Sequence, residues 1–193
     1  EAGPTSDTYT VVLDSQPTSN VTITVDPDGQ SDLGAGAGNS ITLTFTAGDW
    51  STAQTVTVTA VDDAVQEGPH TSTITHAFAS ADANYNGMAI PNIVASITDN
   101  DLPGVTISQS GGSTNVSEAG PTSDTYTVVL DSQPTSNVTI TVDPDGQSDL
   151  GAGAGNSITL TFTAGDWSTA QTVTVTAVDD AVQEGPHTST ITH

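Results

Sequence analysis

The sequence repeats itself without a single substitution. Residues 1–76 recur as residues 118–193, so the chain contains one unit that is read again after an offset of 117 residues, from Glu1 to Glu118. A fixed internal period of this kind is typical of tandem arrays, in which each repeat is one structural module. Identical modules in series favour a mechanical or multivalent role, because an enzyme seldom needs two identical copies in one chain.

The charge of the chain is entirely negative. It has 23 Asp and Glu residues and no Lys or Arg, which gives a formal net charge of -23. Two carboxylates about 4 Å apart repel each other by roughly 4 kcal/mol at an effective dielectric near 20, so clustered acids must be hydrated, protonated or occupied by a cation. The same charge argues against binding to nucleic acids and anionic lipids, since both are normally held by Lys and Arg.

The chain has no cysteine, so neither disulfides nor thiolate metal sites can stabilise it. No apolar run approaches the roughly 18 residues of a membrane span, and we expect no direct insertion into a membrane. The stability of the fold must therefore come from its core and from bound ions.

Apolar residues alternate with Thr in short runs. Residues 8–13 place Tyr9, Val11 and Leu13 on one face, and residues 21–25 alternate in the same way. The period of two continues through residues 41–45, 56–58, 74–78, 93–97 and 105–107, and no segment shows a helical period. Seven short strands in roughly a hundred residues predict an all-β fold of tandem immunoglobulin-like, seven-stranded antiparallel β-sandwiches.

The boundary between the repeats is expected at residues 99–104, where Pro and Gly interrupt strand pairing. We predict a first repeat at residues 1–101 that lacks its first strand, a short linker at 102–104, and a second repeat at 105–193 that lacks its last strand. Incomplete sandwiches expose core and edges, so we expect the sequence to be an excerpt of a longer array. Strand exchange between chains would also close the gaps.

The acids are expected to gather at one end of each sandwich. Strands run from pole to pole, so successive loops alternate between the two poles. One pole then receives most of the acids of the unit, namely Glu1, Asp7, Asp26, Asp28, Asp32, Asp62, Asp63, Glu67, Asp99 and Asp101. Carboxylates from several loops suit Ca²⁺, which takes six to eight oxygens at about 2.3 to 2.6 Å. The alternative is a solvated acidic pole of a protein that works in high salt.

Other metals fit this composition less well. Mg²⁺ requires a stricter octahedron than flexible loops provide. Zinc and copper require His or Cys, and His70 and His76 have no partners at ligand spacing in the sequence, so we expect neither metal. His76 shares the parity of Ile74 and Phe78, which predicts a histidine with a hydrogen-bonded ring at the end of a strand or in the core.

Five short motifs follow one another in a fixed order along the unit. The first is Glu118-Ala119-Gly120, which in the other copy begins at Glu1. It is followed by Asp28-Gly29, residues 41–48, Val61-Asp62-Asp63 with Glu67, and residues 97–101. This order resembles a Calx-beta repeat over the whole unit, and the resemblance implies calcium binding. By that resemblance the ligands are Glu1, Asp28, Asp62, Asp63, Glu67, Asp99 and Asp101, with Glu118, Asp145, Asp179, Asp180 and Glu184 at the repeated positions.

The sequence therefore favours a calcium-binding extender repeat of a large secreted or surface-anchored bacterial adhesin, stiffened by Ca²⁺ at the junctions with neighbouring repeats. A second interpretation is a subunit of an extracellular filament, sheath or surface layer, in which identical chains make lateral contacts. A third is a carbohydrate- or ice-binding module with flat Thr faces. We do not expect an enzyme or an organic cofactor, because no nucleophile elbow is present and the Gly-Ala run at residues 34–38 precedes no helix.

Overall fold

The computed structural model describes residues 1, 3, 5–120 and 122–193. It divides into two compact units, one formed by Glu1–Asp63 with Glu67–Asn100 and the other by Ala64–Gln66 with Asp101–His193. The described residues contain antiparallel strand ladders and one 3₁₀ turn, η1 (Ser110–Gly112), and no α-helix. No helix in the described part of the chain has the length and hydrophobicity to cross a bilayer. The predicted all-β fold is confirmed.

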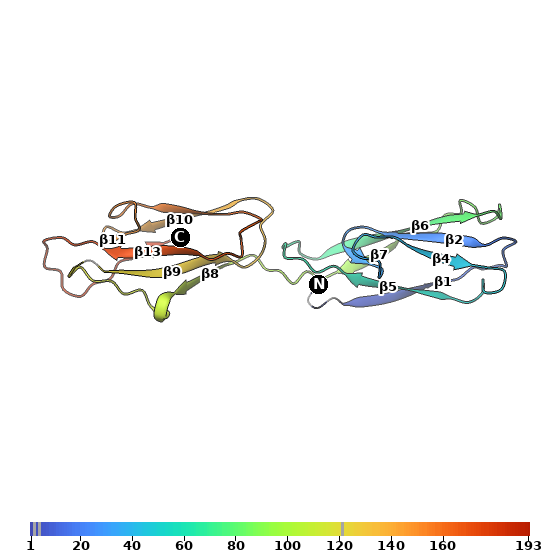
Figure 1. Cartoon of the computed structure of the whole chain (residues 1–193), viewed down its shortest axis with the longest axis horizontal. Coiled ribbons are helices and arrows are strands. Elements are labelled where there is room, and N and C mark those ends of the chain that lie inside the picture. Colours follow the sequence, from blue (N-terminus) through green and yellow to red (C-terminus); the bar gives the residue numbers. More distant parts are fainter. Residues whose placement is uncertain (2, 4, 121) are drawn as a thin grey trace. The chain divides into compact units, whose positions relative to one another are not determined.

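The first unit is a sandwich of two antiparallel sheets (Figure 1). One sheet has the order β1-β5-β3, with strands β1 (Ser6–Val11), β5 (Gln54–Ala60) and β3 (Ser31–Asp32). The other has the order β4-β2-β6-β7, with strands β4 (Ile41–Phe45), β2 (Val21–Pro27), β6 (His70–Ser80) and β7 (Ile93–Ile97). The short strand β3 carries no alternating pattern, and the sequence did not predict it.

The second unit repeats this arrangement with a different set of flanking strands. Its first sheet has the order β11-β13-β9-β8, with β11 (Ser148–Asp149), β13 (Gln171–Ala177), β9 (Ser123–Leu130) and β8 (Val105–Gln109). Its second sheet has the order β12-β10-β14, with β12 (Ile158–Phe162), β10 (Val138–Pro144) and β14 (Ile191–Thr192). Among the described residues, the first unit has no strand beside β1 that corresponds to β8 of the second unit. The second unit has no strand beside β14 that corresponds to β7 of the first.

The core lies between the two sheets of each unit. In β2, Val21, Ile23 and Val25 are fully buried, while the intervening Thr22 and Thr24 face outward or lie at the edge of the core. Phe45 from one sheet and Val56 from the other complete the centre. Alternation of Val and Ile with Thr thus produces one apolar face per strand, and burying these faces against each other drives the sandwich together.

Candidate metal centre

Four segments meet at one end of the first unit. They are Glu1 ahead of β1, the loop after β2 that contains Asp28 and Gln30, residues 67–69 ahead of β6, and Asp99 after β7. Asp99 Oδ2 accepts hydrogen bonds from the backbone N–H groups of Glu67 and Gly68, each at 2.6 Å. Gln30 Nε2 donates to Glu67 Oε1 at 3.0 Å. These contacts hold the ends of distant strands together and bring their carboxylates into one cluster.

Glu1 is the most deeply placed acid in this cluster. Only 4% of the residue is exposed, and neither carboxylate oxygen has a hydrogen-bond partner among the described residues. One of these oxygens lies within 4.8 Å of a carboxylate oxygen of Asp99. Burial raises the pKa of Glu1, the nearby His70 opposes this rise, and the charges of Asp99 and Asp63 add to it. A cation at this position would stabilise the carboxylate, because its oxygens would then have a charged partner.

Asp28 has a structural role beside the cluster. Its carboxylate accepts hydrogen bonds from Ser72 Oγ at 2.6 Å, from the Thr73 N–H at 2.7 Å and from the Gln30 N–H at 3.1 Å. Partial burial alone would raise the pKa of Asp28, but these hydrogen bonds to the charged form outweigh burial and lower it. Ser72 in turn bonds Ser31 Oγ at 2.8 Å, and both serines are fully buried. This chain of contacts ties the Asp28 loop to both sheets.

His70 joins the same cluster, contrary to the expectation that it lacks partners. Its Nε2 lies 3.5 Å from Glu1 Oε1 and 3.4 Å from Glu67 Oε2. Its Nδ1 lies 2.9 Å from the carbonyl oxygen of Gly68, so Nδ1 carries the hydrogen and donates it. The prediction was wrong because Glu1 is distant in sequence and the strand order brings it to His70. The Glu-x-x-His spacing of Glu67 and His70 was the one local signal.

The second unit brings together the repeated side chains. His187 Nε2 lies 3.4 Å from Glu118 Oε1 and 3.5 Å from Glu184 Oε2. The hydrogen bond from His187 to the Gly185 carbonyl raises the pKa of His187, partial burial opposes the rise, and the charges of Glu184 and Glu118 contribute to it. Asp145 accepts hydrogen bonds from Ser189, Thr190 and Gln147, as Asp28 does from the equivalent residues.

Four of the remaining predicted ligands, Asp62, Asp63, Asp179 and Asp180, lie outside these clusters. Asp62 and Asp63 are exposed in the loop between β5 and β6, and Asp179 and Asp180 are exposed in the equivalent segment, where Asp180 accepts a hydrogen bond from the Val182 N–H at 2.6 Å. Asp101 is half-buried and belongs to the second unit. In the described chain, the groups of three ligating side chains within 4.8 Å do not include Asp28, Asp62, Asp63, Asp145, Asp179 or Asp180. Metal ligation by these residues stays a prediction.

In comparisons with known proteins, the chain is similar to several solved structures. No protein-family model matches the sequence, and no curated protein matches it. CBD12 from CALX1.2 is 16% identical at a TM-score of 0.37, over 92% of this chain and 70% of that chain. Calcium binding domain CBD12 of CALX1.1 is 14% identical at a TM-score of 0.37, over 91% and 70%.

A pilus protein complex is also similar. It is the CsuC–CsuE chaperone–tip adhesion subunit pre-assembly complex from the archaic chaperone–usher Csu pili of Acinetobacter baumannii, with 10% identity and a TM-score of 0.31, over 91% of this chain and 84% of that chain. At these identities and TM-scores, none of the three structures assigns the chain to a family. Function is therefore inferred from the side chains of this chain.

Proposed function

We propose that each unit is a calcium-binding structural module, and that the chain is an extender repeat of a large secreted or surface-anchored bacterial adhesin. The observation that carries this proposal is Glu1, a residue that is 4% exposed and lies beside Asp99, and whose two carboxylate oxygens have no hydrogen-bond partner in the part of the chain that the structure describes. Calcium binds oxygen ligands in tolerant geometry and completes its shell with backbone carbonyls and water. Because the chain has no Lys or Arg, none of its side chains carries a permanent positive charge that could neutralise this carboxylate.

Calcium would stabilise the folded unit by mass action. An ion that binds only the native state adds about 2.7 kcal/mol to the free energy of unfolding at a concentration of 100 times its Kd. It would also remove the repulsion between the carboxylates of Glu1, Glu67 and Asp99, which belong to three separate segments. Loss of the ion would therefore loosen the end of the sandwich where these segments meet.

The extender role follows from the repeat and from the position of two acids in the sequence. Asp99 and Asp101 flank the boundary at which one unit ends and the next begins. Ions bound by these residues would restrict swivelling between neighbouring repeats and give an array reach and stiffness. In this proposal the chain works at the cell surface or outside the cell, its partners are neighbouring repeats, and it is neither an enzyme nor a nucleic-acid-binding protein.

Differential scanning calorimetry in calcium, in magnesium and in a chelator tests the calcium part of the proposal. We expect calcium to raise the Tm of the first unit well above its value in chelator, and magnesium at equal concentration to raise it less. Asp99→Asn should reduce the calcium-dependent rise, whereas Asp49→Asn, at an exposed turn where Asp49 bonds Thr46, should leave it unchanged. A Tm that is the same in calcium and chelator would reject calcium binding.

Small-angle scattering on the same samples tests the extender part. We expect the chain to stay monomeric at matched concentration in calcium and chelator, with a larger maximum dimension in calcium. Polymerisation on addition of calcium would instead favour the filament or surface-layer subunit.

A further inference from the structure

We propose that His70 with Glu1 and Glu67, and His187 with Glu118 and Glu184, form two binding sites for a divalent transition-metal ion of the zinc type. The sites lie in separate units and use a nitrogen donor that calcium does not favour. They share carboxylates with the proposed calcium ligands but require a histidine that calcium binding does not. The proposal therefore goes beyond calcium binding and does not depend on it.

The histidine is oriented as a metal ligand. Its Nδ1–H donates to the Gly68 carbonyl at 2.9 Å, which fixes the tautomer and leaves the Nε2 lone pair directed at Glu1 and Glu67. Metal-binding histidines almost always donate their other N–H to a backbone carbonyl, a carboxylate or water in this way. His187 repeats the arrangement, with Nδ1 at 2.9 Å from the Gly185 carbonyl.

The distances favour a shared ion over a direct ion pair. Charge-assisted N–H···O bonds are about 2.7 to 2.9 Å long, whereas Nε2 of His70 lies 3.5 and 3.4 Å from the two carboxylates. Two donors that are each about 2.1 Å from a tetrahedral zinc ion lie roughly 3.4 Å apart. The spacing between the ring nitrogen and each carboxylate therefore matches an edge of a zinc tetrahedron, with a fourth position left for water.

Burial supplies an independent reason to expect a ligand. The side chain of Glu1 is 0% exposed and that of His70 is 17% exposed. Both oxygens of Glu1 and the Nε2 of His70 are buried, and none of them has a hydrogen-bond partner within residues 1, 3, 5–120 and 122–193. Polar atoms in such positions are costly unless something binds them, and Glu1 Oε1 lies only 3.5 Å from His70 Nε2.

The second unit repeats the cluster in a more open form. The side chains of His187 and Glu118 are 33% and 29% exposed, yet the distances from Nε2 to the two carboxylates are 3.4 and 3.5 Å. Glu118 Oε1 is also buried without a hydrogen-bond partner. The same geometry thus forms in two units with different flanking strands, and we expect the more exposed second site to bind zinc more weakly.

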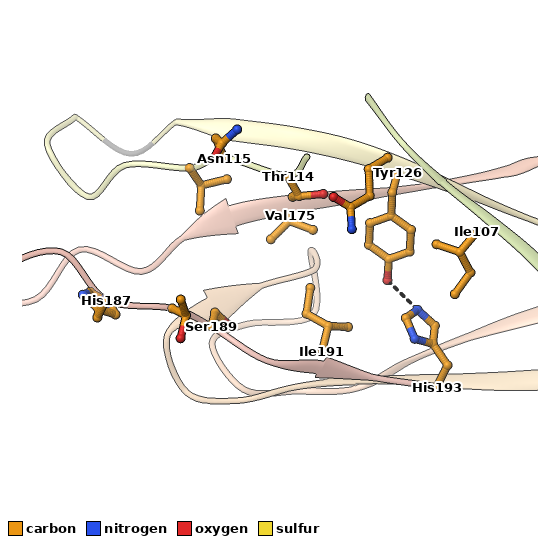
Figure 2. Close-up of a pocket in the computed structure, with 12 residues that line it drawn as sticks. Ile107, Thr114, Asn115, Tyr126, Val175, His187, Ser189, Ile191 and His193 are labelled. Carbon is orange, nitrogen blue, oxygen red and sulfur yellow. Dashed lines mark hydrogen bonds between the residues drawn. The ribbon is translucent and has the colours of Figure 1, made fainter. Parts of the chain in front are cut away.

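Nitrogen-15 NMR of the histidine rings in the full chain, titrated with ZnCl₂ after removal of calcium, tests the proposal. We expect the Nε2 resonances of His70 and His187 to shift to the values of a metal-bound nitrogen while their Nδ1–H signals persist. His76 and His193 serve as internal controls, because their Nε2 atoms bond Tyr9 and Tyr126. Figure 2 shows His193 paired with Tyr126, and His187 farther along the same segment beyond Ser189.

Calorimetric titration of two histidine variants separates this site from the calcium site. His70→Gln should weaken zinc binding in the first unit at least about tenfold, the loss typical even for an outer-shell partner, and His187→Gln should do the same in the second. Calcium binding should be unchanged in both. Zinc shifts at His76 or His193 instead, or no shift of His70 and His187 at millimolar zinc, would overturn the proposal. Neither result would contradict the proposal that the units bind calcium.

Discussion

At the scale of single residues, the Tyr9–His76 pair links the two sheets of the first unit. Tyr9 Oη lies 2.9 Å from His76 Nε2, and the rings meet edge to face with centroids 5.7 Å apart. Burial lowers the pKa of His76 and raises the pKa of Tyr9 to about 12. The hydrogen-bonded ring predicted for His76 is confirmed. Both shifts favour the neutral forms of the side chains. The pair therefore contributes most to the stability of the fold at pH values between the ordinary pKa values of His and Tyr.

The pH dependence of stability follows from these two directions. The unfolded state binds the His76 proton more readily than the folded state, so this contribution is present above about pH 6.5 and is lost as the pH falls through the folded value. The raised pKa of Tyr9 adds stability that is present below about pH 10 and is lost as the pH rises toward 12.

Urea unfolding of Trp167→Phe, in which Trp50 reports on the first unit, measures this dependence. We expect the free energy of unfolding to fall above pH 10, and Tyr9→Phe to remove most of that alkaline loss. If the free energy of unfolding falls equally above pH 10 with and without the Tyr9 hydroxyl, the assignment of this loss to the Tyr9–His76 pair is wrong.

At the scale of strands, a buried serine pair connects the sheets beneath the candidate metal centre. The Ser31 hydroxyl on β3 donates to Ser72 Oγ on β6 at 2.8 Å, because the single Ser72 hydroxyl hydrogen is donated to Asp28. Ser72→Ala leaves the buried Ser31 hydroxyl without its acceptor and the Asp28 carboxylate without one of its donors, which should lower the free energy of unfolding by about 1 to 3 kcal/mol.

Chemical denaturation with the Trp50 reporter measures this loss. Thr42→Ala, on the exposed face of β4, is the matched control and should change stability by no more than about 0.5 kcal/mol. Equal effects of the two substitutions would show that the serine pair contributes nothing specific.

Most strands could be predicted from alternation, but their burial could not. Tyr126 and Val128 on β9 are 4% and 0% exposed, whereas the same residues on β1, Tyr9 and Val11, are only half-buried. Strand β9 has β8 as a neighbour, with Ile107 opposite Val128. Local sequence is identical in the two strands, so the difference comes entirely from pairing with a segment elsewhere in the chain.

The candidate site shows the same limit. The meeting of the segments that carry Glu1, Glu67 and Asp99 could be predicted, since strands that run from pole to pole place successive loops at alternate ends. The contact between His70 and Glu1 could not, because it depends on the strand order β1-β5-β3 facing β4-β2-β6-β7. The two-residue strands β3 and β11 were missed because they are too short to show a period.

At the scale of the whole molecule, the net charge of -23 would attract cations to the folded chain. Each unit gathers carboxylates and one histidine at a cluster, and the exact repeat would place equivalent clusters at regular intervals along a longer array. Stability and stiffness of such an array would then depend on the concentration of divalent cations around it. An isolated solvated acidic end would instead respond to ionic strength, whichever cation supplied it.

Isothermal titration calorimetry of the full chain with CaCl₂, at constant ionic strength, tests the central claim most directly. We predict saturable binding of at least one ion per unit, with the first-unit site lost in Glu1→Gln and the second-unit site lost in Glu118→Gln. Binding heats that are absent at millimolar calcium, or that are unchanged in both variants, would contradict the assignment of these carboxylates to a calcium site.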